Sequence, residues 1–228
     1  AVLSWVRWVM VHKRTPGAEV KEAVEPELAN AVVPDQLVPH AHIDSKDILD
    51  DWCEGTGSQD LWDDFGAGDR IDHPRGMTIE EADHMSATRL YQNNAHPHFD
   101  AVAMQQSPTG RRLVYGGHVI SVCRSLAYDG LENVLSVLAI NGGRHVHPTV
   151  SGDTLYAFSS VIDKWKIPGR TDVGALRLKL VGLKNLAPAG VMATQATNEG
   201  SSYHPAIVLD LDYTVLMPRK QLMGSRHE

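Results

Sequence analysis

Residues 118–130 read His-Val-Ile-Ser-Val-Cys-Arg-Ser-Leu-Ala-Tyr-Asp-Gly, and this stretch decides the fold. Its apolar positions recur at the spacing of one face of an α-helix: Val119, Val122, Cys123 and Leu126. The pair Asp129-Gly130 then supplies a stop signal. We therefore expect a helix over His118–Ala127 that buries its apolar face against a sheet.

Strand patterns follow this helix in series. An apolar run covers Leu135–Asn141, and a second run, Thr154–Ile167, follows a Gly152-Asp153 turn. Two later stretches alternate apolar and polar residues, which is typical of strands with one buried face: residues 176–181 and 207–217. One central helix followed by four or more antiparallel strands indicates an α+β fold in which the sheet wraps the helix.

A polar segment upstream of the helix holds the candidate catalytic residues. Thr78-Ile-Glu-Glu81 matches a capping box and predicts a helix to about Tyr91, and a short helix begins near Asp100. Between these helices Asn93 and His98 lie five positions apart, on a loop that can hold a water molecule and move its proton. The alternative interpretation is helix-end capping with a surface histidine.

These motifs resemble the MaoC-like branch of the hot-dog dehydratases. Asn93-x-Ala95-x-x-His98-Phe99-Asp100 resembles that family's active-site segment, and Gly116-Gly117 resembles the glycine pair or His-Gly that begins its central helix. Four longer stretches are similar to its mesaconyl-CoA hydratase (β-methylmalyl-CoA dehydratase) group: Arg89–Asn93, Gly110–Ser121, Ala139–Asn141 and Pro148–Asp153. The resemblance covers roughly residues 60–220 and departs from the family at His96-Pro97.

The resemblance implies a hot-dog fold and reversible hydration of a branched dicarboxylic enoyl-CoA thioester, with mesaconyl-CoA as the favoured substrate. No cofactor is implied, since the CoA thioester is itself the substrate. His98 would act as general acid and base, while Asn93, which does not titrate, would hold the water. The Gly117 amide, at the start of the helix, would donate to the thioester oxygen.

Other polar residues have two interpretations each. His118 either contacts the substrate or only lies at a helix N-terminus. Arg89 and Arg112 are candidates to bind the substrate carboxylate, although Arg111-Arg112 also fits a solvated turn. The pairs His96-x-His98 and His145-x-His147 suggest a metal, but neither has a third ligand at a recognisable spacing, so we predict no metal site.

Two other functions stay open. A thioesterase on the same fold would use a carboxylate, and Asp100 is available, although it lies where we expect a helix cap. A non-catalytic domain that binds acyl-CoA or completes a neighbour's site would leave Asn93 and His98 unrelated to any pocket.

The chain divides into three predicted parts. Residues 1–14 have the composition of a strand and, shifted by 206 positions, resemble the end of the chain, so we interpret them as the last strand of a preceding, missing hot-dog repeat. Residues 15–60 are rich in proline, alanine and acids and predict a linker with one or two short helical turns. Residues 61–228 form the hot-dog domain. We expect a homodimer or a complex with a separate N-terminal repeat.

Charge and composition exclude several classes of protein. Residues 15–64 contain 13 acids and 2 bases, so the net charge of −7 comes from this region. No basic stripe with interleaved aromatic residues indicates nucleic-acid binding. We also predict no signal peptide and no transmembrane helix. Cys53 and Cys123 match no metal or redox spacing, which favours a reducing cytoplasm.

Overall fold

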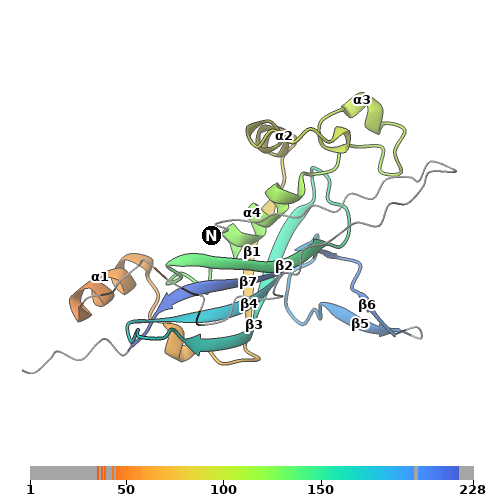
Figure 1. Cartoon of the computed structure of the whole chain (residues 1–228). Helices are drawn as coiled ribbons and strands as arrows, with labels where there is room; N and C mark the ends of the chain where they lie inside the picture. Colours follow the sequence, from red (N-terminus) through yellow and green to blue (C-terminus); the bar gives the residue numbers. More distant parts are fainter. Residues whose placement is uncertain are drawn as a thin grey trace, which may run out of the picture.

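A five-stranded antiparallel sheet in the order β1-β3-β4-β7-β2 carries the fold (Figure 1). The computed structural model describes residues 35, 37, 39, 43, 45–197 and 200–220. The strands of the main sheet are β1 (Arg70–Thr78), β2 (Ser136–His145), β3 (Thr154–Lys166), β4 (Val173–Lys184) and β7 (Ile207–Pro218). A separate hairpin consists of β5 (Thr194–Thr197) and β6 (Gly200–Tyr203).

The helix that the sequence placed at His118–Ala127 is α4, and it spans Gly116–Leu126. All four residues of its predicted apolar face are buried, and they pack against one face of the sheet: Val119, Val122, Cys123 and Leu126. The facing strand residues alternate as expected, with Leu176, Leu178 and Leu180 of β4 fully buried. The predicted hot-dog arrangement, an antiparallel sheet around one central helix, is confirmed.

The approach of α4 to the sheet is close because β4 has a glycine beneath it. A Cβ atom at Gly182 would lie 2.6 Å from the Cys123 sulfur. Real Cβ atoms are not found at that separation, so a side chain here would push the helix away. Gly182 therefore allows α4 to lie close to β4 at Cys123.

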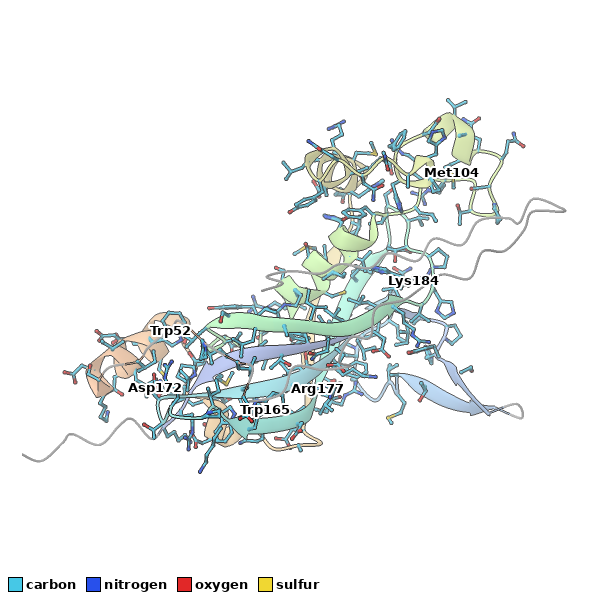
Figure 2. All side chains as sticks on the ribbon, viewed as in Figure 1. Trp52, Met104, Trp165, Asp172, Arg177 and Lys184 are labelled. Carbon is cyan, nitrogen blue, oxygen red and sulfur yellow. The ribbon has the colours of Figure 1, made fainter. Side chains whose placement is uncertain are left out.

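The opposite face of the sheet combines ion pairs with two apolar covers. In its middle, Arg177 forms a bidentate pair with Asp212, and Lys179 pairs with Asp210. One end is covered by the segment between β4 and β7. Val191 and Tyr203 of this segment pack against a buried cluster that contains Phe158. In Figure 2, Arg177 lies near the middle of the sheet, with Asp172 toward the α1 end and Lys184 toward the other.

The other apolar cover is α1 (Lys46–Thr56), which corrects part of the predicted linker. We expected one or two short helical turns in residues 15–60, but α1 has 11 residues. Ser45 caps its N-terminus, and its buried residues Leu49 and Cys53 join a cluster with β4 and β7. Residues 1–14, with the proposed repeat, lie outside the described residues.

Three of the remaining elements lie around the N-terminal end of α4. They are α2 (Glu81–Leu90), the 3-10 turn η3 (His96–His98) and α3 (Ala101–Met104), and a further 3-10 turn, η2 (Trp62–Asp64), precedes β1. Asp100 caps α3 as predicted, its carboxylate accepting from the Ala103 amide at 2.9 Å. In Figure 1, α2 and α3 lie together at the opposite end of the molecule from α1.

The predicted capping box at Thr78–Glu81 is wrong. Thr78 ends β1, and its hydroxyl bonds to the Thr154 hydroxyl at 2.8 Å across the β1–β3 pair. The cap of α2 is Glu80, with no side-chain capping bond, and the Glu81 carboxylate bonds to residues distant in sequence. The strand and these tertiary partners take both side chains away from the helix start. The predicted helix end is confirmed, since Tyr91 follows the last residue of α2.

Candidate active site

A cavity of about 580 Å³ opens beside the N-terminal end of α4. Three chain segments line it: the loop after α2, the segment that enters α4, and the end of β2 with the turn that follows. The lining residues that matter for chemistry are Asn93, His98, Tyr115, Gly116, His145 and His147. Asn93 and His98, predicted from their spacing, the glycine pair downstream and the family resemblance, both line this cavity.

His98 is held in one tautomer by the backbone. Its Nδ1 lies 3.1 Å from the Leu113 carbonyl oxygen. A carbonyl only accepts, so Nδ1 carries the proton of the neutral ring and Nε2 is left as a basic nitrogen. The Leu113 amide donates to the Pro97 carbonyl at 2.8 Å, which fixes the same loop from the other side. The Tyr115 ring contacts the imidazole edge to face, with centroids 5.9 Å apart.

Asn93 is anchored through its oxygen. Its side-chain Oδ1 accepts from the backbone amide of Ala95 at 2.9 Å, and its backbone amide donates to the Thr88 carbonyl at the end of α2. The side-chain oxygen is therefore committed to the local turn, which leaves the Nδ2 group as a donor. An amide placed in this way can donate to the oxygen of a water molecule whose proton a neighbouring base removes.

The glycine pair lies at the first turn of α4, but it is Gly116 that lines the cavity. The first helical hydrogen bond is donated by His118 to the Tyr115 carbonyl, so both glycine amides precede it and have no intrahelical acceptor. A Cβ atom at Gly117 would lie 2.6 Å from the Tyr115 ring. Gly117 thus packs under that tyrosine, and both amides lie at the positive end of the helix dipole.

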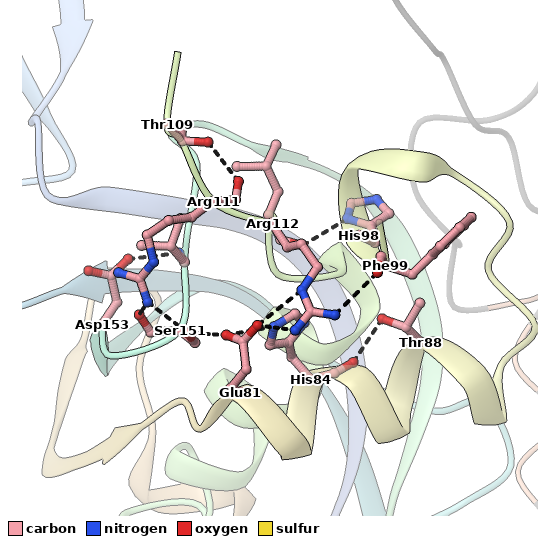
Figure 3. Close-up of polar contacts among 12 residues, drawn as sticks. Glu81, His84, Thr88, His98, Phe99, Thr109, Arg111, Arg112, Ser151 and Asp153 are labelled. Atoms are coloured by element: carbon pink, nitrogen blue, oxygen red, sulfur yellow. Dashed lines mark hydrogen bonds and ion pairs between the residues drawn. The ribbon is translucent and has the colours of Figure 1, made fainter. Parts of the chain in front are cut away.

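The two arginines predicted to bind a carboxylate lie outside the cavity lining. Arg89 is exposed in the last turn of α2. Arg112 pairs with Glu81 of α2 and also donates to the Phe99 carbonyl at 3.2 Å (Figure 3). Since Phe99 directly follows His98, Arg112 ties the candidate catalytic loop to α2.

Glu81 is the centre of this network. It lies between the two arginines in Figure 3, bonded to Arg112 and to the Ser151 hydroxyl, while Arg111 donates to the Ser151 carbonyl at 2.6 Å. The Ser151 hydroxyl and the Arg112 guanidinium together lower the pKa of Glu81 to about 2. A carboxylate that is charged throughout the physiological range therefore joins α2 to the loops on both sides.

His118 faces α2, away from the cavity lining. Burial lowers its pKa, which nearby Asp83 partly opposes. The fully buried His84 of α2 lies close by, with Nε2 3.5 Å from Glu81, and burial lowers its pKa as well. Both rings are therefore favoured in the neutral form between α2 and α4.

From the sequence, His145 and His147 were candidates only as metal ligands. In the structure they end β2 and enter the following turn, where both line the cavity. Among the residues that the structure describes, no group of three or more histidine, cysteine or acidic side chains is placed to hold a metal ion. The sequence indicated only that the two histidines share one face of a strand. It could not show that they line the same cavity as His98.

The Asp100 carboxylate, considered for a thioesterase, is the cap of α3 and is not part of the cavity lining.

In the described part of the chain no helix is both long and apolar enough to cross a membrane.

Comparison with known proteins gives one consistent group. The family model described as mesaconyl-CoA hydratase matches residues 1–195. The beta-methylmalyl-CoA dehydratase of Chloroflexus aurantiacus is 50% identical over 220 residues, which are 96% of this chain and 60% of that protein. The mesaconyl-CoA hydratase of Cereibacter sphaeroides is 44% identical over 221 residues, 96% of this chain and 61% of that protein.

A solved structure agrees with these sequences. A protein from Chloroflexus aurantiacus, described as a MaoC domain protein dehydratase, superposes with a TM-score of 0.84 at 47% identity, covering 92% of this chain and 58% of that one. The chain therefore spans about three fifths of the length of the curated relatives it matches.

Proposed function

Because this chain belongs to the mesaconyl-CoA hydratase family, we propose that it carries the active site of a hydro-lyase for a branched dicarboxylic enoyl-CoA. The favoured reaction is the reversible addition of water to mesaconyl-CoA, giving β-methylmalyl-CoA. The observation that supports it most is the placement of His98. Its Nε2 is left as a base in the same cavity as Asn93 and the first turn of α4.

The proposed mechanism divides the work between these groups. His98 Nε2 removes a proton from water while the Asn93 Nδ2 group donates to the water oxygen. The oxygen adds at Cβ, and electrons move through Cα onto the thioester oxygen, where the free amides of α4 stabilise the enolate. The protonated His98 then delivers that proton to Cα while the enolate electrons form the new Cα–H bond and the thioester carbonyl is restored, so that H and OH have been added and His98 is a base again. No cofactor enters this scheme.

The edge strand β2 suggests the partner. It is one border of the sheet and is largely exposed, with Ile140 66% and Val137 44% accessible. An exposed ten-residue edge is a template for pairing with another strand. We propose that a second hot-dog domain, either another copy of this chain or a separate N-terminal repeat, pairs along β2. Such a partner would cover the side of the cavity formed by His145 and His147.

We also propose that the protein lies in the cytoplasm. Both cysteines of the chain are free thiols buried in the structure, which fits a reducing cytoplasm.

The test follows the enoyl-thioester absorbance of mesaconyl-CoA with the wild-type protein and with His98→Ala. We expect the band to disappear with the wild type, without release of free thiol, and a rate at least about 10²-fold lower with the variant. His96→Ala is the matched control, since His96 is exposed on the same loop outside the cavity lining. Thiol release would indicate a thioesterase, and binding without turnover would indicate a pairing or acyl-CoA-binding domain.

A further inference from the structure

His145 is the one histidine of the cavity whose ring is not fixed by the backbone. His98 Nδ1 donates to the Leu113 carbonyl at 3.1 Å, and His147 Nδ1 donates to the Ile207 carbonyl at 2.6 Å. Within the described residues, His145 has no hydrogen-bond partner. Both of its ring nitrogens are therefore available to a molecule bound in the cavity.

The position of this ring depends on Gly116. A Cβ atom at Gly116 would lie 2.4 Å from His145 Nε2, closer than to any other atom of the ring. The missing side chain thus leaves a space beside the first residue of α4, and Nε2 is the ring atom nearest to that space. Gly116 is also the first of the two glycines whose backbone amides have no intrahelical acceptor. A ring nitrogen that is able to carry a proton and the positive end of a helix therefore lie at one place.

His145 is exposed at the end of β2 but lines the cavity, and its surroundings favour the neutral form of the ring. Burial lowers the pKa of His145, and the neighbouring His98 lowers it further. A neutral imidazole is a good donor to a carbonyl oxygen, since it polarises the oxygen without giving up its proton. His145 is therefore suited to donate a hydrogen bond, whereas His98 must exchange a proton.

We propose that His145 is a catalytic residue that donates Nε2–H to the thioester oxygen of the substrate, beside the first amides of α4. The inference rests on the proposed hydratase function and names a group of that same site. When water adds at Cβ, charge develops on the thioester oxygen and the hydrogen bond from His145 strengthens. When Cα takes its proton the charge leaves again, so His145 keeps its own proton throughout the reaction.

The test replaces the donor and keeps a planar ring. In His145→Phe we expect kcat for mesaconyl-CoA to fall about 10²–10³-fold, the usual effect of losing one oxyanion donor, with little change in KM. His96→Phe is the matched control, because His96 is exposed and outside the cavity lining, and its rate should match that of the wild type.

A second measurement reads the hydrogen bond without turnover. Infrared difference spectra of isotope-labelled thioester carbonyl are recorded with substrate bound to His98→Ala and to the His98→Ala/His145→Phe double variant. We expect the carbonyl band to move to higher frequency in the double variant, because the oxygen has lost a donor.

The outcomes separate the two proposals. An unchanged band and an unchanged kcat in His145→Phe, with an active wild type, overturn the role of His145 alone. A loss confined to KM, again with an unchanged band, also overturns it and assigns the ring to the substrate carboxylate. If the wild type neither binds mesaconyl-CoA nor hydrates it, both the function and this inference fail.

Discussion

At the scale of single residues, Gly116 has a role that its amide alone does not explain. Because Gly116 has no side chain, the His145 ring can lie against the N-terminus of α4. We predict that Gly116→Ala displaces this ring and lowers kcat for mesaconyl-CoA by about 10-fold or more, since small displacements in a site can cost up to about 10²-fold. Steady-state kinetics measure the effect.

Gly142→Ala is the matched control for this prediction. Gly142 lies on β2 three residues before His145 and is not part of the cavity lining. Nothing lies within 4 Å of the Cβ atom that it would gain, so the activity of this variant should not change. Equal kcat values for the two alanine variants would show that the ring tolerates the added methyl group, and that Gly116 is not needed for its position.

At the scale of elements, Glu81 joins α2 to the catalytic loop and to the turn after β2. Its pKa of about 2 is below the ordinary 4.5, so its ionised form stabilises the folded state. This stabilisation is complete above about pH 4.5 and is lost as the pH falls toward 2. We predict that Glu81→Gln lowers the free energy of unfolding at pH 7, and that its difference from the wild type shrinks at pH 3.

Urea denaturation followed by tryptophan fluorescence measures both values. Glu80→Gln removes the same charge from the preceding residue, which is exposed and makes no side-chain capping bond, and it should have a much smaller effect at pH 7. Equal destabilisation by the two variants would mean that α2 responds to charge near its N-terminus and not to the pairing of Glu81 with Arg112 and Ser151.

At the scale of the whole molecule, both cysteines report on the integrity of the core. Cys123, fully buried between α4 and the sheet, has its pKa raised by burial to about 12, and burial also raises the pKa of Cys53, a buried residue of α1. The cysteine thiolate attacks a sulfur of a disulfide reagent and displaces its other half as a thiolate, so the reagent must be able to reach the ionised cysteine. We predict that neither cysteine of the native protein reacts with a chromogenic disulfide reagent, and that both react after unfolding in guanidinium.

Ser125→Cys supplies the positive control, because Ser125 is exposed on the same helix two residues from Cys123. It should react at once in the native protein. Rapid labelling of the wild type would contradict the closed packing of α4 or α1 against the sheet. The same result matters for the hydratase assay, where unreactive protein thiols allow released CoA to be counted.

Much of the fold followed from local patterns. The spacing of Val119, Val122, Cys123 and Leu126 identified the buried face of α4, and the alternation in β4 and β7 identified the strands, because both patterns repeat with the period of the element itself. The length of α1 was underestimated, because its apolar face has only two buried residues, Leu49 and Cys53, within an acidic segment. Its stability comes from the sheet that it covers.

By itself, the sequence determined the sheet around one helix, the family resemblance and the placement of Asn93 and His98 on one loop. Only the tertiary structure decided what the neighbouring polar residues do. Arg112 is paired with Glu81 and Phe99 outside the cavity lining, while His145 reaches the cavity from a strand 47 positions after His98. Periodicity encodes which face of an element is buried, but it carries no information about which distant side chains compete for the same partner, and that competition is settled only by packing.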